Sequence, residues 1–317
     1  MEMKNEFLLI VLIWNSLLGI TCMVEGTPKP QVERLPSPRT TLGEIPHWSQ
    51  KTLSLYYVDI HGPNSLLLRY DYQENRVYSA SVSGAPSLLF LLPIACTKDQ
   101  FLVGIDRTTV VVQWDGRSPE ATILRPLFEV DCETSNYTTF NDVKTDERGR
   151  FYGGTKFVEK GVPCTSVAEP IAAFYGYESG KCVKKFFGNV ILSNGLTWVR
   201  PTNKFYYIDS CTYDIKQFDY DPRTGDLSNG HQIFSSIMQN GTKPDYIFDG
   251  MTNDQDGNLY VATFGGSKII KLNPRTKKIL MEIELPATQV TSLAFGGPKL
   301  DILFVTTANK DGKQPEG

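Results

Sequence analysis

Six short β-rich phrases recur along this chain at a near-constant interval. They are YYVD at 56–59, FLVG at 101–104, FYGG at 151–154, FYYI at 205–208, LYVA at 259–262 and LFVT at 303–306. The steps between them run roughly 44 to 54 residues, the range typical of repeats that form the blades of a β-propeller. We therefore expect an all-β fold, a six-bladed β-propeller whose blades surround a central channel.

The segments between the phrases support strands and not helices. Residues 66–71, 215–220 and 269–272 each alternate or run apolar, and each is followed by a turn rich in Asn, Asp, Pro or Gly. This pattern is typical of antiparallel hairpins. We expect a Pro-rich lead-in at 27–40 and the propeller at 41–317. The last blade is expected to be incomplete at its C-terminal end, with residues 27–40 filling its open edge in part.

The N-terminus carries a candidate export signal. Residues 7–18 read FLLIVLIWNSLL, an apolar run of signal-peptide length that is too short to span a bilayer. We expect residues 1–26 to be a signal peptide cleaved between Cys22 and Gly26, and the protein to be secreted into the extracellular space. Lys4 is flanked by two glutamates, so an uncleaved apolar tail or an anchor is the alternative. No other segment is expected to enter a membrane.

Charge and cysteine content limit the partners and the redox chemistry. The formal net charge is −3 and no basic run occurs, so we expect no nucleic-acid partner. Residues 27–317 contain five cysteines, an odd number that leaves at least one thiol outside any intrachain pairing. Cys164 and Cys182 are candidates for a disulfide in an oxidising compartment. The alternative is five buried thiols that act as small apolar side chains.

Four oxygen-bearing side chains stand at matching distances before the phrases. About eleven to thirteen positions before the second residue of four phrases lie Glu44, Asn141, Asn194 and Asp249. That offset puts each at the start of an innermost strand, so all four would point into one end of the channel. Carboxylate and amide oxygens without histidine or thiolate suit a hard divalent cation. Taken singly, each residue is better explained as a turn residue, and the occurrence of four at matching offsets favours the cation site instead.

The other two repeats lack such side chains. Residues 89–91 (LFL) stand at the same offset in the second repeat, and Thr291 and Ser292 stand there in the last. The expected cation site is therefore built by four of the repeats.

Several phrases resemble one known family. They are GEIPHW at 43–48, FNDVKTD at 140–146, SNGLTW at 193–198, YYIDS at 206–210 and DGM at 249–251. In this order and spacing they are similar to the regucalcin family, also called the senescence marker protein, gluconolactonase or luciferin-regenerating-enzyme-like family. The resemblance runs from about residue 42 to the end. It implies a six-bladed propeller with one catalytic divalent metal, held by Glu44, Asn194 and Asp249, and substrate contacts at Asn141 and Glu159.

Two departures from the family pattern affect the expected function. Family members of the vertebrate type carry an Arg where this chain has Thr139, and that Arg donates to substrate hydroxyls, so Thr139 is a candidate substrate-binding position with altered preference. Those relatives are cytoplasmic and lack an export signal, and their chains continue past residue 317 with a closing strand. Glu159 also has a plain alternative, because Lys156, Glu159 and Lys160 together read as a solvated loop.

The resemblance implies metal-dependent hydrolysis of a lactone. Asp249 is expected to bind the metal and to act as general base, Ca²⁺ is the expected cation, and Zn²⁺, Mn²⁺ or Mg²⁺ are alternatives. A lactone or other sugar-like small molecule is the expected substrate, and we expect a monomer. The alternative is a secreted non-catalytic or calcium-binding regulatory propeller that binds a small ligand or a protein.

Overall fold

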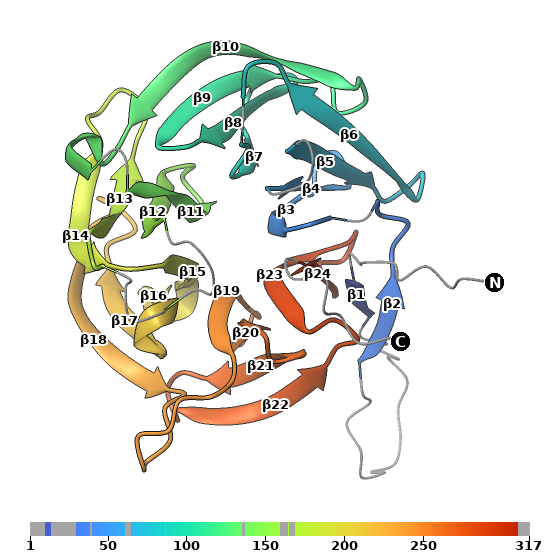
Figure 1. Cartoon of the computed structure of the whole chain (residues 1–317). Helices are drawn as coiled ribbons and strands as arrows, with labels where there is room; N and C mark the ends of the chain where they lie inside the picture. Colours follow the sequence, from blue (N-terminus) through green and yellow to red (C-terminus); the bar gives the residue numbers. More distant parts are fainter. Residues whose placement is uncertain are drawn as a thin grey trace.

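The chain folds into antiparallel strands arranged radially around one central axis (Figure 1). The computed structural model describes residues 10–13, 30–38, 40–60, 65–85, 87–134, 137–158, 164 and 169–309. Within these ranges the regular structure is strand, apart from three one-turn 3-10 helices at Cys132–Thr134, Arg200–Thr202 and Ser210–Thr212. The prediction of an all-β chain is confirmed. None of the described helices has the length or apolar character needed to cross a bilayer.

The strands follow one another in short antiparallel runs. The first two runs are β3 (Gly43–Ser49), β4 (Ser54–Asp59), β5 (Leu66–Asp71) and β6 (Arg76–Val82), and then β7 (Leu91–Pro93), β8 (Gln100–Ile105), β9 (Thr108–Gln113) and β10 (Glu120–Glu129). The next two are β11 (Thr138–Thr145), β12 (Phe151–Phe157), β13 (Ala172–Tyr177) and β14 (Lys184–Val190), and then β15 (Ser193–Val199), β16 (Lys204–Asp209), β17 (Asp214–Tyr220) and β18 (Leu227–Ser235). A further run holds β19 (Ile247–Asn253), β20 (Leu259–Phe264), β21 (Lys268–Asn273) and β22 (Lys278–Glu284).

The last run is completed by the N-terminal segment. The strand β23 (Gln289–Gly296) pairs with β24 (Ile302–Ala308), β24 pairs with β1 (Ile10–Ile13), and β1 pairs with β2 (Gln31–Arg34). The segment 27–40 thus contributes β2 as its part of this edge, with β1 between it and β24. Because β1 lies inside the expected signal peptide, a chain cleaved between residues 22 and 26 would leave the edge of β24 uncovered.

The recurring phrases form the buried second strand of each run. They fall in β4, β8, β12, β16, β20 and β24, and β4 and β24 are buried along their whole length. Outer strands such as β18 and β22 are mostly exposed. A strand that is covered on both faces has no polar face, which explains why the phrases are continuously apolar and do not alternate.

The first strand of each run lies nearest the axis. In Figure 1 these are β3, β7, β11, β15, β19 and β23, and the pairs β11–β15, β15–β19, β19–β23 and β23–β3 are in contact. Residues at equivalent places in these strands therefore meet at the axis although they are far apart in the sequence. This arrangement positions the site described below.

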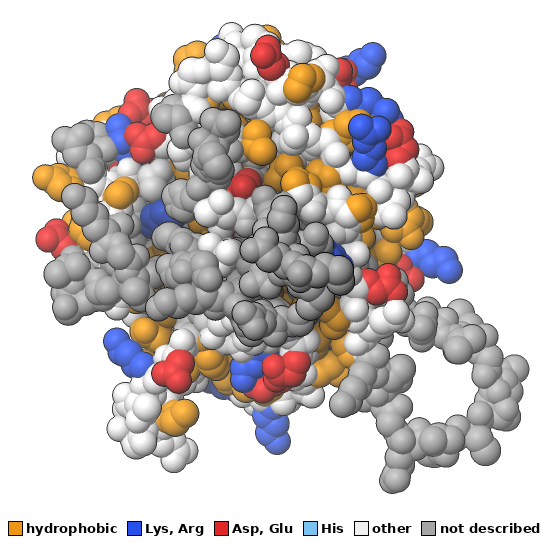
Figure 2. Space-filling view, turned by 45° about the vertical axis from the view of Figure 1, so that its right-hand side comes forward, with side chains coloured by type: hydrophobic (Ala, Val, Ile, Leu, Met, Phe, Trp, Pro, Cys, Tyr) orange, Lys and Arg blue, Asp and Glu red, His pale blue; other side chains and the backbone are white. Residues whose placement is uncertain are grey.

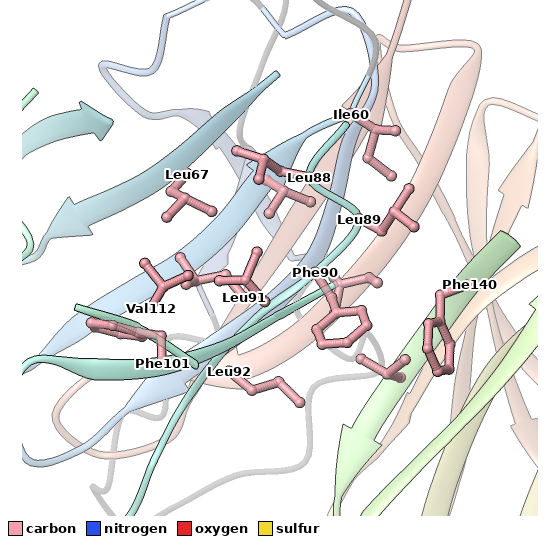
Figure 3. Packing of buried hydrophobic residues seen from close by; sticks show 14 of the residues in the cluster. Ile60, Leu67, Leu88, Leu89, Phe90, Leu91, Leu92, Phe101, Val112 and Phe140 are labelled. Carbon is pink, nitrogen blue, oxygen red and sulfur yellow. The ribbon is translucent and has the colours of Figure 1, made fainter. Parts of the chain in front are cut away.

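The second run fills its share of the centre with apolar side chains. Residues 88–92 (LLFLL) are all buried, and the ring of Phe90 lies 5.6 Å from those of both Phe140 and Phe151 (Figure 3). Gly104 lies against Phe90, where a Cβ atom would come within 2.3 Å of the ring. The absence of a polar residue at this offset, seen in the sequence, is thus explained by core packing.

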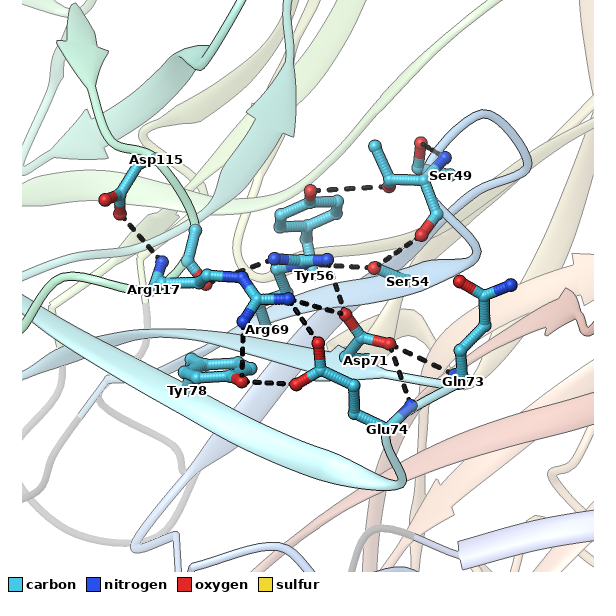
Figure 4. Close-up of polar contacts among 12 residues, drawn as sticks. Ser49, Ser54, Tyr56, Arg69, Asp71, Gln73, Glu74, Tyr78, Asp115 and Arg117 are labelled. Carbon is cyan, nitrogen blue, oxygen red and sulfur yellow. Dashed lines mark hydrogen bonds and ion pairs between the residues drawn. The ribbon is translucent and has the colours of Figure 1, made fainter.

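Polar clamps join neighbouring runs at their rims. Arg69 donates to Asp71 at 2.8 Å and to the carbonyl oxygen of Gly116 at 3.4 Å, while Arg117 pairs with Glu74 (Figure 4). Gly116 and Arg117 belong to the turn between β9 and β10, whereas Arg69, Asp71 and Glu74 belong to the β5–β6 hairpin. The buried hydrogen bond from Arg69 to Gly116 is the stronger of the two contacts between the runs, since an exposed pair such as Arg117–Glu74 contributes little. On the described surface of Figure 2, basic side chains lie beside acidic ones and form no continuous stripe.

The cysteine pairing differs from both sequence-based interpretations. Cys164 forms a disulfide with Cys211, with a Cα–Cα distance of 4.9 Å, and Cys182 is an exposed free thiol, as are Cys96 and Cys132. The Cys164–Cys182 pairing was wrong because the six-residue strand β13 separates the two cysteines. Such a strand spans about 20 Å, far beyond the roughly 7 Å limit for a disulfide.

Replacing Phe90 with Ala tests the apolar centre. We expect the Phe90→Ala variant to lose about 3–5 kcal/mol of unfolding free energy, because a fully buried aromatic ring leaves a cavity among Phe140 and Phe151. Equilibrium urea unfolding measures the loss. Leu124→Ala, at a 49% exposed position of β10, is the control and should change the free energy of unfolding by less than about 0.5 kcal/mol. Equal stability of the two variants would contradict the packing argument.

Candidate metal centre

The innermost strands share a local irregularity at the level of the candidate ligands. Regular pairing is interrupted between Phe140 and Val143 in β11, between Ser193 and Leu196 in β15, and between Phe248 and Met251 in β19. In each case two residues face one residue of the next strand, which is a β-bulge. The strand β3 has the same irregularity between Glu44 and His47. A bulge bends the strand and re-aims its side chains, here at the level where the inner strands meet.

The bulges bring three of the sequence-predicted residues together. Asn141 donates from Nδ2 to Oδ1 of Asn194 at 3.2 Å and to the carbonyl oxygen of Ser193 at 2.8 Å. The strand that carries Asp249 lies equally close, since a Cβ atom at Gly195 would come within 2.7 Å of the carbonyl oxygen of Asp249, and Asn194 lowers the pKa of the Asp249 carboxyl. Residues from β11, β15 and β19 therefore form one connected polar group.

Asn194 is held in a defined orientation. Its Nδ2 donates to Ser210 Oγ at 2.9 Å, and Ser210 Oγ donates to the carbonyl oxygen of Phe248 at 2.6 Å. This chain of hydrogen bonds links β15 and β19 through the 3-10 helix at Ser210–Thr212. With its amide nitrogen engaged in this way, Asn194 presents Oδ1 as the atom that can serve as a ligand.

Glu44 interacts electrostatically with Asp249, a member of this polar group. Glu44 and Asp249 are 9% and 5% exposed. Burial raises the pKa of Glu44 to about 8, and the carboxylate of Asp142 adds to the rise. Burial also raises the pKa of Asp249 well above its usual range, and the charges of Glu44 and Asp142 act in the same direction. A cation bound between these two desolvated carboxylates would offset their mutual repulsion and the cost of their burial.

The donor set fits a hard divalent cation. Two carboxylates and one amide oxygen are the ligand types that Ca²⁺ and Mg²⁺ prefer. Among the described residues, no three His, Cys, Asp or Glu side chains lie close enough to hold a metal by themselves. A cation bound here would therefore need the amide oxygen of Asn194 together with Glu44 and Asp249.

Two charged residues near the site were missed from the sequence. Asp142 is 2% exposed and its charge reaches both Glu44 and Asp249. Strict alternation would place it on the opposite face from Asn141, and the bulge removes that alternation. Lys156, which reads equally well as part of a solvated loop, lies in β12 directly opposite Thr139. Its charge lowers the pKa of Glu44 and of Asp249, and the pairing of β11 with β12 is the signal that could have found it.

The residues expected to bind substrate, Thr139, Asn141 and Glu159, do not form one cluster of contacts among the described residues. The hydroxyl of Thr139 donates to the carbonyl oxygen of Asp106 at 3.1 Å, in the turn between β8 and β9. Asn141 is part-buried within the polar group described above. Glu159 lies outside the described residues.

The last run contributes hydroxyl groups at the same level. Thr291 Oγ1 donates to the carbonyl oxygen of Gly43 at 2.6 Å, next to Glu44. This bond ties β23 to β3 and supports the backbone that carries Glu44.

A separate cavity opens at the other end of the axis. It has a volume of about 780 Å³ and is lined where β11, β15 and β19 end, with Lys144, Thr197, Trp198 and Asn253 in its wall. Lys144 donates to the carbonyl oxygen of Met251, and burial lowers its pKa. The side chain of Lys144 thus lies between this cavity and the candidate metal ligands.

The raised pKa of Glu44 predicts a pH dependence for the metal-free protein. Between the ordinary value of 4.5 and about 8, the folded chain holds a proton at Glu44 that the unfolded chain has lost. The proton on Glu44 stabilises the folded state. This contribution to the free energy of unfolding is fully present below pH 4.5 and is lost as the pH rises through 8. We expect Glu44→Gln to lose less stability than the natural sequence between pH 5 and pH 8.5. Thermal unfolding in a chelator measures this, with exposed Glu120→Gln as the control that should follow the natural sequence.

Known proteins share this fold and much of this sequence. Regucalcin of Macaca fascicularis is 34% identical over 275 residues, which cover 87% of this chain and 85% of the relative. A solved luciferin-regenerating enzyme is 32% identical with a TM-score of 0.78, over 86% of this chain and 85% of that one. Regucalcin from Agrobacterium tumefaciens, a calcium-binding protein, has a TM-score of 0.71 at 18% identity, over 86% and 84% of the two chains, and shows the fold alone.

A family model covers nearly the whole described chain. Residues 42–309 match the model of the SMP-30/gluconolactonase/LRE-like region, which includes all four bulged strands and each of the described candidate ligands. The match and the identity to regucalcin over most of both chains agree with each other. The chain therefore belongs to the SMP-30/gluconolactonase/LRE-like family.

Proposed function

We propose that this protein is a divalent-cation-dependent lactonase whose cation is held by Glu44, Asn194 and Asp249. The observation that carries the proposal is the buried polar group formed by Asn141, Asn194 and Asp249, beside the carboxylate of Glu44. Buried like charges of this kind are costly unless a function uses them, and perturbed carboxylates cluster at active sites. The family membership supports a lactone as the substrate class.

The propeller that carries this site has six blades in our proposal. Six recurring phrases occupy the second strand of six successive runs, and the last run gains its outer strands from β1 and β2. One blade for each phrase accounts for this order, with residues 41–309 as the main body.

The cation is Ca²⁺ in this proposal, with Mg²⁺, Mn²⁺ or Zn²⁺ as weaker candidates. All three proposed ligand atoms are oxygens, and Ca²⁺ favours carboxylate and amide oxygens. When bound, such a cation polarises the lactone carbonyl and lowers the pKa of a nearby water. The relative from Agrobacterium tumefaciens is described as a calcium-binding protein, which is consistent with this choice.

The residues of the chain supply orientation and proton transfer. Asp249 accepts the proton of the attacking water while the new C–O bond forms at the carbonyl carbon. The bond from that carbon to the ring oxygen then breaks, and Asp249 returns the proton to the leaving ring oxygen, which gives a hydroxy acid. Asn141, whose Nδ2 donates to Ser193 and Asn194, offers its Oδ1 to substrate hydroxyls. Burial keeps bulk water away from the reacting atoms.

One observation favours a second function, a calcium-binding propeller without turnover. Thr139 is uncharged, and its hydroxyl is engaged with the carbonyl oxygen of Asp106, so it offers no cationic donor to a substrate. A site that keeps its metal ligands and lacks this donor can bind a cation or a small ligand without converting it.

We also propose that the protein works outside the cell. The Cys164–Cys211 disulfide supports this, because disulfides persist in oxidising compartments. The apolar run at residues 7–18 supports export as well. Mass spectrometry of the secreted chain determines whether the segment that contains β1 is retained.

Replacing Asp249 with Ala tests the catalytic assignment. We expect Asp249→Ala to lower the rate of aldonolactone hydrolysis by at least about 100-fold and to weaken cation binding at the same time, because one carboxylate serves both roles. A pH-indicator assay with added Ca²⁺ and isothermal titration calorimetry measure the two effects. Asp245→Ala, at an exposed position four residues earlier, is the matched control. Normal turnover in Asp249→Ala would refute the assignment.

Replacing Thr139 with Arg separates the two functions. We expect Thr139→Arg to raise the rate of aldonolactone hydrolysis by roughly 10-fold or more, because the guanidinium supplies a donor for substrate hydroxyls. The Thr139→Ser variant, which keeps the hydroxyl, is the control. If neither the natural chain nor Thr139→Arg hydrolyses lactones while both bind Ca²⁺, the calcium-binding function is the correct one.

A further inference from the structure

Asp142 is a buried carboxylate without a hydrogen-bond partner. Its side chain is 2% exposed, and neither of its carboxylate oxygens has a partner among the described residues. Leaving such a group unsatisfied is unfavourable, and folded proteins rarely tolerate it without a functional reason. These two oxygens are therefore available to a hydrogen-bond donor that is not part of the protein.

The location of Asp142 indicates what could donate hydrogen bonds to its carboxylate oxygens. Asp142 and Asn141 together form the β11 bulge, and Asn141 is bonded directly to Asn194. The charge of Asp142 raises the pKa of Glu44 of β3 and of Asp249 of β19, so its carboxylate lies near both of these residues. Lys144, two residues further along β11, donates to the carbonyl oxygen of Met251, and its charge lowers the pKa of Asp142 without a hydrogen bond to either carboxylate oxygen.

Asp142 does not form a three-carboxylate cluster with Glu44 and Asp249, the two carboxylates of the proposed ligand set. No three acidic, His or Cys side chains of the described chain lie close enough to share one metal. Asp142 therefore lies outside the set formed by Glu44, Asn194 and Asp249. Hard divalent cations take six or more oxygen ligands, so three protein ligands leave several positions for water. Those water molecules need hydrogen-bond acceptors, and a carboxylate provides about four lone-pair sites.

We propose that Asp142 is the outer-shell acceptor of the metal centre, whose two oxygens bind water molecules in the coordination shell of the cation held by Glu44, Asn194 and Asp249. The inference rests on the proposed metal site and adds a residue that positions its water. Outer-shell partners of this kind change metal affinity about 10- to 100-fold. They also orient the water that attacks the substrate.

This role makes opposite predictions for the metal-free and the metal-bound protein. Without metal, burial disfavours the charge of Asp142 more than the nearby charge of Lys144 favours it, so neutralising Asp142 raises the melting temperature. With metal, the same change removes acceptors for the bound water, so affinity falls. A residue that only supports the fold would lower the melting temperature and leave the affinity unchanged.

The test compares Asp142→Asn with a matched buried aspartate. Asp71 is 5% exposed and accepts hydrogen bonds from Arg69 and from the backbone N–H groups of Gln73 and Glu74, so Asp71→Asn removes a satisfied carboxylate far from the site. Calorimetric titration with Ca²⁺ at pH 7.5 and thermal unfolding in a chelator are measured for each variant. We expect Asp142→Asn to bind Ca²⁺ about 10- to 100-fold more weakly and to melt higher without metal. Asp71→Asn should melt lower and bind Ca²⁺ normally.

The outcomes distinguish this inference from the proposal on which it rests. If the natural chain binds no divalent cation, the proposed metal site fails and the inference fails with it. If the natural chain and Asp142→Asn bind Ca²⁺ equally, the metal site stands and the role of Asp142 is refuted. Should Asp142→Asn fail to fold, Asp142→Ser leaves room for a water in place of the carboxylate, and it is subject to the same two measurements and the same criteria.

Discussion

Two buried carboxylates of like charge, Glu44 and Asp249, are held together at the centre of this molecule, and the structure around them makes that arrangement possible. Their proximity opposes folding in the absence of a cation, as their raised pKa values express. The surrounding structure offsets this cost with continuous apolar strands and with contacts between runs such as that from Arg69 to the carbonyl oxygen of Gly116. The stability of the fold thus supports a centre that is unfavourable by itself, which is common at functional sites.

Close approach of the inner strands brings the ligands within reach of one another. A Cβ atom at Gly195 would lie 2.6 Å from the Cβ of Met251, and one at Gly250 would lie 2.6 Å from the Cβ of Ser292. Only glycine fits at these two positions without a shift of the neighbouring strand. The glycines that follow Asn194 and Asp249 in the sequence are therefore explained by packing between strands and not by a turn.

The repeat spacing predicted much of this structure, and local irregularities account for the remainder. The apolar phrases and their offsets located the second strands and the ends of the inner strands that carry Asn141, Asn194 and Asp249, because both depend on regular repetition. Asp142 escaped because a bulge cancels the alternation on which strand reading rests. The partner of Cys164 escaped because it lies in another run, and no local pattern connects the loops of different runs. The pairing of β1 with β24 is likewise a contact between the two ends of the sequence.

The shared bulge has a consequence for how this centre can change. A point substitution at Asn141, Asn194 or Asp249 exchanges one side chain of the site and leaves the ladder of the sheet in register. Deleting a single residue from a bulge would restore perfect pairing, and every side chain on one side of the cut would then turn to the other face of the strand. The number of residues in these inner strands is therefore under tighter constraint than their chemical identity. Substitutions in the inner strands can therefore alter the site while the fold is kept, whereas insertions and deletions in these strands cannot.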